Sequence, residues 1–214
     1  GVPALRFSHQ AGHIMAAATT CGKPDIACSP FLCFHVSGGT TELVYATPSD
    51  KNGFDVKIVG GTADISAGQL IDRTGVLLGL KFPCGGELEK LAEKVGKQKL
   101  KISANGALCN YSGAENNTVK MLRDGKSAAE TARYALDFCS ASLISSVRAA
   151  RKDYGDIPVL FAGGVMRDMI IRHELENELE NIFFGSVELS SDNAVGTAWL
   201  GKKALERSDR WNVR

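Results

Sequence analysis

The chain has 214 residues, of which 44% are hydrophobic and 23% are charged, a composition typical of a globular protein with one or two cores. Its 25 Lys and Arg residues and 24 Asp and Glu residues give a formal net charge of +1, so no overall positive field attracts nucleic acid. The six cysteines form no CxxC pair, and no apolar run approaches the roughly 18 residues of a membrane span. These features predict a soluble, cytoplasmic protein without a membrane partner.

The first half of the chain combines one Ala-rich helical segment with short β-prone runs and then two segments with helical spacing of apolar residues. The first two β-prone runs are joined by a glycine turn, which favours a hairpin. The predicted elements are a helix at 8–20, strands at 31–36, 42–46 and 54–59, and helices at 64–78 and 88–95.

The second half opens with a polar stretch, 96–125, that is rich in Gly, Asn and Ser and is interpreted as a mobile or variable insertion. A long helix is predicted over 127–154, with Ser127 and Glu130 placed to cap its start. The remaining predicted elements are a strand at 158–162, a helix at 167–180, a strand at 183–189 and a helix at about 194–205. This alternation predicts an α/β fold in which helices are layered on a mixed sheet.

Two histidines, His9 and His13, are four residues apart in the first predicted helix. At that spacing both imidazoles lie on one face of the helix and can bind one transition metal, although ordinary surface or core histidines are the alternative. A zinc protease of the HExxH kind needs a glutamate directly after the first histidine as general base, and Gln10 cannot accept a proton in that role. A metalloprotease is therefore the least favoured interpretation.

Two glycine turns each follow a predicted strand. Glycine lets backbone amides approach an anion closely, and a turn that leads into a helix directs amides and the positive helix end toward phosphate. Each turn is equally compatible with a tight hairpin or a tight strand-to-helix bend. The two turns are Ser37-Gly38-Gly39-Thr40-Thr41 and Ala162-Gly163-Gly164-Val165.

Three acidic residues lie in motifs rather than on solvated faces. Asp64 and Asp72 belong to the helical segment that precedes Phe82-Pro83-Cys84-Gly85-Gly86, and Asp192 precedes the last predicted helix. An aspartate in that last position commonly caps the helix and contributes about 1 kcal/mol. A third metal ligand is the other interpretation of Asp192.

Taken in order, these motifs resemble the TsaD family and its archaeal and eukaryotic counterparts, formerly described as O-sialoglycoprotein endopeptidases or glycoproteases. The resemblance extends from His9 to about Leu200. It rests on HxxxH, Val-Ser-Gly-Gly, an Asp-Arg helix leading into Leu-Gly-Leu-Lys-Phe-Pro-Cys-Gly-Gly, Ala-Gly-Gly-Val and Ser-Asp-Asn-Ala. The resemblance implies an actin/hexokinase/Hsp70-like (ASKHA) fold and transfer of a threonylcarbamoyl group from threonylcarbamoyl-AMP to tRNA adenosine.

The resemblance also implies which residues form the site, although it identifies no catalytic residue. One divalent metal ion, iron or zinc, would be bound by His9, His13 and Asp192. An adenine nucleotide or threonylcarbamoyl-AMP would be held by Val36, Ser37, Gly38, Gly39, Thr40, Asp72, Gly85, Gly163, Gly164 and Asp168.

Three positions depart from the family's pattern. Ala11 stands where family members generally carry glutamate, Thr40 stands where histidine or asparagine is common, and Asp168 stands where they carry asparagine. A carboxylate at position 168 would repel a bound phosphate unless it is protonated or turned away. The alternative function is therefore a divergent, catalytically silent paralogue that binds nucleotide or metal and docks a partner.

The family's usual chain has a further segment before the HxxxH motif, so we expect an N-terminally truncated ASKHA fold that is inactive alone. Residues 1–30 are expected to be a remnant of the first domain, 31–182 the second domain with a helical or loop insertion near 87–125, and 183–214 a return to the first domain. Unpaired strand edges favour self-association or an ASKHA-fold partner subunit.

Contact with tRNA is the remaining partner hypothesis. A lysine cluster could contact the tRNA backbone, although a solvated helix end is the more ordinary interpretation. The cluster consists of Lys94, Lys97, Lys99 and Lys101.

Overall fold

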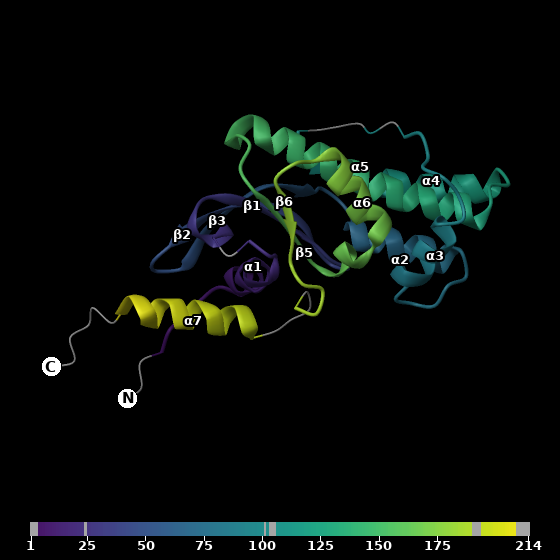
Figure 1. Cartoon of the computed structure of the whole chain (residues 1–214). Coiled ribbons are helices and arrows are strands. Elements are labelled where there is room, and N and C mark those ends of the chain that lie inside the picture. Colours follow the sequence, from purple (N-terminus) through teal and green to yellow (C-terminus); the bar gives the residue numbers. More distant parts are fainter. Residues whose placement is uncertain (1–3, 24, 101, 103–105, 190–193, 209–214) are drawn as a thin grey trace.

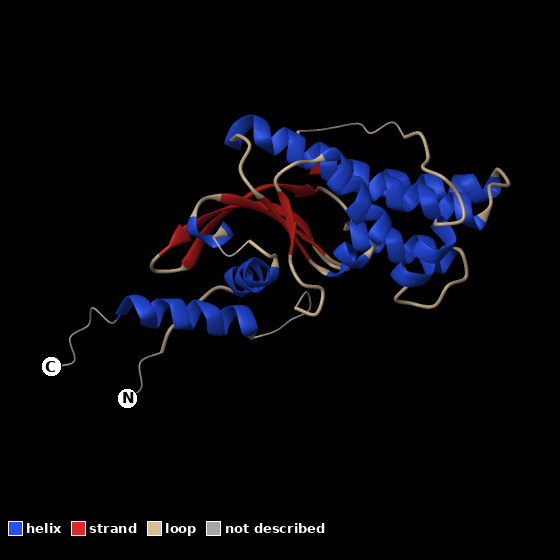
Figure 2. Cartoon of the chain, viewed as in Figure 1, coloured by secondary structure: helices blue, strands red, loops and turns tan. Residues whose placement is uncertain are grey.

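The computed structural model describes residues 4–23, 25–100, 102, 106–189 and 194–208. A six-stranded sheet lies at the centre, with helices on both of its faces (Figure 1 and Figure 2). The helices are α1 (His9–Thr20), α2 (Ala67–Leu77), α3 (Gly85–Ala92), α4 (Ser112–Arg123), α5 (Ala128–Tyr154), α6 (Met169–Glu178) and α7 (Val195–Ser208). The strands are β1 (Phe31–Val36), β2 (Thr41–Ser49), β3 (Gly53–Thr62), β4 (Leu108–Cys109), β5 (Val159–Ala162) and β6 (Ile182–Phe184).

Strand β1 is one of two strands, with β3, at which the sheet changes from antiparallel to parallel pairing. The strand order is β4-β3-β2-β1-β5-β6; β1 pairs antiparallel with β2 and parallel with β5. In the parallel pair, His35 is opposite Ala162, so both strands end at the same edge of the sheet. The residues that follow this last pair are Val36, which ends β1 directly before the first glycine turn, and Gly163, which lies in the second.

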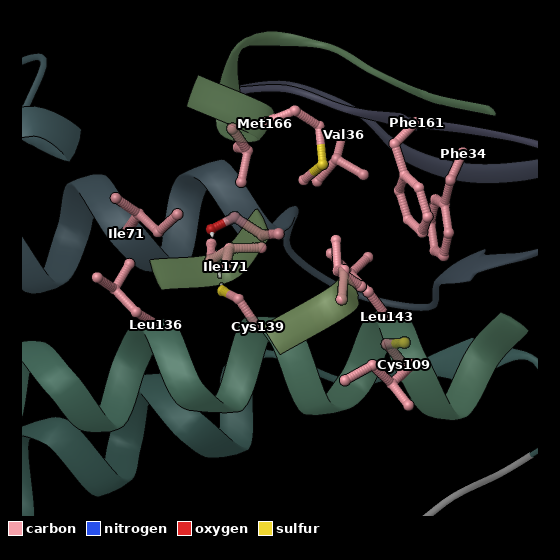
Figure 3. Packing of buried hydrophobic residues seen from close by; sticks show 14 of the residues in the cluster. Phe34, Val36, Ile71, Cys109, Leu136, Cys139, Leu143, Phe161, Met166 and Ile171 are labelled. Atoms are coloured by element: carbon pink, nitrogen blue, oxygen red, sulfur yellow. Dashed lines mark hydrogen bonds between the residues drawn. The ribbon is translucent and has the colours of Figure 1, made fainter. Parts of the chain in front are cut away.

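The alternation of side chains along β1 divides the core into two layers. Leu32, Phe34 and Val36 belong to the larger cluster, which packs against α2, α3 and α5. Phe31 and Cys33 belong to the smaller cluster, which packs against α1 and α7. Figure 3 shows the larger cluster, in which the rings of Phe34 and Phe161 stack with centroids 5.9 Å apart.

Capping boxes explain where two of the helices around the larger cluster, α5 and α2, begin. The Ser127–Glu130 capping box predicted for α5 is present. In α2 the hydroxyl of Ser66 accepts from the amide of Gln69, whose side chain accepts from the amide of Ser66. That second capping box makes α2 begin at Ala67, three residues later than predicted.

The polar stretch predicted to be a mobile or variable insertion contains β4 and α4. The carboxylate of Asp64 accepts hydrogen bonds from the amides of Tyr111 and Ser112 and from the Ser112 hydroxyl. Tyr111 is fully buried in the larger cluster. The described part of this stretch is therefore attached to the core. Its composition did not predict α4, because the carboxylate that caps the start of this helix comes from Asp64, far earlier in the sequence.

Helices α1 and α7 lie against each other on the second face of the sheet (Figure 1). A Cβ atom on Gly196 would overlap with the carbonyl oxygen of Gly12, so glycine permits the close approach. The strand predicted at 183–189 is shorter: β6 ends at Phe184, and a Cβ atom on the next residue, Gly185, would overlap with Ala17 of α1. The division into domains stays a prediction. None of the helices in the described part of the chain combines the length and apolarity that a bilayer crossing requires.

Candidate functional site

The two glycine turns lie together at the carboxyl ends of β1 and β5. Gly163 has φ 105°, and a Cβ atom there would overlap with the carbonyl oxygen of Val36. Only glycine adopts this conformation and tolerates this contact without strain. The second turn is therefore fixed against the start of the first, and residues 36 and 163 are neighbours although 127 positions separate them in the chain.

The first turn, 37–40, closes over the N-terminus of α2. The amide of Ser37 donates to the carbonyl of Thr40 over 2.8 Å, and the Ser66 hydroxyl donates to the carbonyl of Gly38 over 2.7 Å. A Cβ atom on Gly68 would lie 2.8 Å from the amide nitrogen of Gly38. This arrangement places the amide of Gly38 beside the N-terminus of α2, the positive end of that helix. Backbone amides and a helix N-terminus both attract anions.

A cleft of about 490 Å³ lies beside the first turn. Its lining residues are Gly38, Gln69, Asp72, Arg73, Val76 and Phe82. One oxygen of Asp72 accepts from the amide of Cys84 over 2.8 Å, which fixes the carboxylate at the cleft wall. Phe82 is 74% exposed, so an aromatic face is available to a ligand in the cleft. The structure thus brings two predicted site residues, Gly38 and Asp72, to one cavity.

Gly85 and Gly164 do not line this cleft. Gly85 begins α3 directly after Cys84, whose amide Asp72 holds. Gly164 begins a short 3-10 turn that ends at Arg167. The remaining predicted residues, Gly39 and Thr40, complete the first turn.

Asp168 is buried at the start of α6. One carboxyl oxygen accepts from the amide of Ile171 over 3.0 Å, and the other is buried without a hydrogen-bond partner. Burial raises the pKa of Asp168 to about 7, and the nearby Glu89 adds to the shift. The carboxyl is thus engaged through one oxygen as a helix cap, and burial favours its protonated form.

The two histidines of α1 face each other. Their Nε2 atoms are 3.0 Å apart, and their ring centroids are 4.5 Å apart. Two imidazole ligands on one tetrahedral zinc ion have nitrogen atoms about 3.3 Å apart, because each Zn–N bond is about 2.0–2.1 Å. The donor set and spacing of His9 and His13 therefore fit a zinc or iron ion.

The third predicted ligand, Asp192, lies outside the described residues. Within the described ranges, no three His, Cys, Asp or Glu side chains are arranged to hold a metal ion. The metal site consequently stays a prediction, to which the structure adds the pairing of two imidazoles.

Two residues beside the site were not predicted from the sequence. His35 stacks on His13, with ring centroids 5.3 Å apart, and Phe82 lines the cleft. A signal for His35 was present, because it is the one polar side chain in the otherwise apolar strand 31–36. Phe82 had no comparable signal, since exposure of an aromatic ring depends on the folded loop.

Comparison with protein families gives one match over most of the chain. The model of the TsaD family, described as tRNA N6-adenosine threonylcarbamoyltransferase, matches residues 1–199. The enzyme of that name from Streptococcus pneumoniae is 28% identical over 226 residues, which cover 99% of this chain and 62% of the relative. The Kosmotoga olearia enzyme is 32% identical over 216 residues, which cover 96% and 63%. The chain thus spans less than two thirds of the length of these relatives.

Solved structures with similar folds are more distant in sequence. HypF of T. kodakarensis has a TM-score of 0.65 at 15% identity, over 96% of this chain and 37% of that one. The activator of 2-hydroxyisocaproyl-CoA dehydratase from Clostridium difficile, solved with bound ADPNP, has a TM-score of 0.58 at 15% identity, over 95% and 69%. These similarities confirm the predicted α/β, actin/hexokinase/Hsp70-like fold.

Proposed function

Because the chain belongs to the TsaD family of tRNA N6-adenosine threonylcarbamoyltransferases, we propose that it takes part in transfer of a threonylcarbamoyl group from threonylcarbamoyl-AMP to tRNA. One observation carries the proposal. The two glycine turns meet at the carboxyl ends of β1 and β5, beside a cleft that contains Asp72. Ligands of open α/β sheets bind at such strand ends, where the connections diverge.

The cleft combines polar and apolar groups that would suit the phosphate, ribose and base of an adenine nucleotide. The amide of Gly38 and the N-terminus of α2 would take up phosphate charge, and the second oxygen of Asp72 would accept from a ribose hydroxyl. Phe82 and Val76 would face the base, because stacking needs an exposed aromatic surface. The three parts of the ligand would thus meet an anion site, a carboxylate and an apolar wall.

A divalent metal ion would be bound by His9, His13 and Asp192. Gly196 lies against Gly12, which is next to His13 in α1. Asp192 is only four residues before Gly196 in the sequence, a separation that a chain can span to reach the histidine pair. A cation bound there would polarise carbonyl and phosphate oxygens. The close approach of α7 to α1 supports this ligand set.

The proposed reaction exchanges one bond at the carbamoyl carbon for another. The N6 amine of adenosine attacks the carbamoyl carbon, a C–N bond forms, the C–O bond to the phosphate of AMP breaks, and the proton released from N6 passes to water. The amides of the first turn would stabilise charge on the departing phosphate. At a pH below about 7 the neutral carboxyl of Asp168 would add a hydrogen-bond donor instead of a repelling charge.

A second candidate function is a catalytically silent protein that binds a nucleotide or metal and docks an ASKHA-fold partner. The buried, half-paired carboxyl of Asp168 favours it, because at higher pH this carboxyl would oppose phosphate binding. The lysine cluster adds no support for tRNA binding, since Lys97 is paired with Glu174 and Lys101 lies outside the described residues.

Calorimetry of the chain with AMP and with a non-hydrolysable threonylcarbamoyl-AMP analogue tests the proposal. We expect 1:1 binding of both, weakened at least tenfold by Asp72→Asn, because a charge-assisted hydrogen bond contributes about 1.5–3 kcal/mol. Asparagine keeps an oxygen for the amide of Cys84, so folding should be retained. Asp156→Asn, at an acid that is 69% exposed, is the matched control.

Metal analysis provides the second arm. Protein washed free of loosely bound ions should retain about one equivalent of iron or zinc, which a His9→Ala, His13→Ala double variant should lose. A folded chain that binds metal but no adenylate would support the silent alternative. A folded chain that binds neither ligand would refute both candidates.

A further inference from the structure

His35 contributes a third imidazole to the histidine pair of α1. Its ring stacks on that of His13, with centroids 5.3 Å apart and an angle of 27° between the planes. His13 in turn meets His9 edge to face, at 87°. The three rings form a continuous row that begins on α1 and ends on β1.

The surroundings of His35 hold its ring in one place. Strand alternation puts His35 on the face of the sheet that α1 covers, together with Phe31 and Cys33. Its partner across the antiparallel ladder is Glu42, whose carboxylate accepts from the side chain of Gln10 on α1 over 3.5 Å. On the other side, a Cβ atom on Gly163 would lie 3.0 Å from Cδ2 of His35. The ring therefore fills a space bounded by α1, β2 and the second glycine turn.

We propose that His35 is a positioning residue, which fixes the ring of His13 by stacking and so prepares the histidine pair to bind a metal ion. The inference rests on the proposed metal site and adds a residue to it. The absence of a three-ligand group among the described side chains agrees with a supporting role.

Residues that orient a metal ligand commonly change affinity by about 10–100-fold when they are removed. Stacking restricts ring rotation through contact area and ring electrostatics, so an aromatic replacement should preserve it and an aliphatic one should not. His35→Phe and His35→Leu form a matched pair. Both replacements are apolar and suit a strand whose other side chains are apolar.

The test is titration of the metal-free protein with Co²⁺, followed by visible absorption. We expect His35→Leu to weaken binding about tenfold and to change the d–d bands, and His35→Phe to stay within about threefold of the unchanged protein. His173→Ala removes a remote histidine, 74% of whose side chain is exposed, and should change nothing. Thermal melts of each variant check that the fold is retained.

Ring NMR of the metal-free protein gives a readout that needs no metal. In His35→Leu the ring signals of His9 and His13 should shift while that of His173 stays in place. Equal Co²⁺ affinity for the Leu variant and the unchanged protein would overturn the inference. Equal loss in both variants would also overturn it, because His35 would then be a ligand. Shifted ring signals without Co²⁺ binding by the unchanged protein would instead refute the proposed metal site.

Discussion

Replacing Asp168 by asparagine tests whether a buried carboxyl at the start of α6 controls stability. Asparagine keeps the oxygen that accepts from the amide of Ile171 and is an equally good helix cap. It removes only the ability to ionise. The variant and the unchanged chain should therefore differ mainly in how their stability depends on pH.

The size of the effect follows from the pKa of about 7, against an ordinary value of 3.8. The folded state binds more protons than the unfolded state between these two values, so stability falls as pH rises through this window and levels off above pH 7. Between pH 5 and pH 8 the linkage amounts to roughly 2–3 kcal/mol, since one pKa unit corresponds to about 1.4 kcal/mol.

Urea unfolding of both proteins at pH 5, 6, 7 and 8 measures the difference, in which other titrating groups cancel. The asparagine variant should gain in relative stability as pH rises, with most of the change below pH 7. A constant difference from pH 5 to pH 8 would refute the reasoning, because it would mean that the pKa of Asp168 is close to its ordinary value in the folded protein.

Three further substitutions test other parts of the fold and the cleft. Gly163→Ala should destabilise the chain by at least about 3 kcal/mol in thermal melts, because the turn has a positive φ and its Cβ would overlap a carbonyl, whereas Gly164→Ala, with nothing within 4 Å, should cost far less. Phe82→Ala should weaken binding of a fluorescent adenine nucleotide about tenfold without lowering the melting temperature, because the ring is largely exposed. Asp137→Ala should destabilise the chain by about 3 kcal/mol in urea, because the buried guanidinium of Arg133 loses its carboxylate at 2.8 Å and keeps only the longer contact with Glu174, at 3.7 Å.

Local signals in the sequence predicted most of the fold. The strand at 31–36 and the capping box of α5 are confirmed, since both depend on neighbouring residues. Elements set by distant contacts were missed or misjudged. The start of α4 depends on Asp64, almost fifty residues earlier, and the residue that follows β6, Gly185, lies against Ala17 of α1.

The candidate site divides in the same way. Glycine turns and the spacing of His9 and His13 can be recognised in a sequence, and the family resemblance drawn from them is confirmed. What the sequence could not indicate is proximity: the contact of Gly163 with Val36, the stacking of His35 on His13, and the cleft that joins Gly38 to Phe82. The pKa of Asp168 is also a property of burial, which a sequence position does not specify.

The odd and even positions of β1 point to different halves of the molecule. Leu32, Phe34 and Val36 pack on the side of α2, α3 and α5, and His35 lies on the α1 side with Phe31. Inserting or deleting one residue in this strand would exchange the side chains that face its two sides. The imidazole of His35 would then enter the larger hydrophobic cluster, and the ring of Phe34 would face the histidines of α1. Length variation within β1 should therefore be tolerated only in steps of two residues.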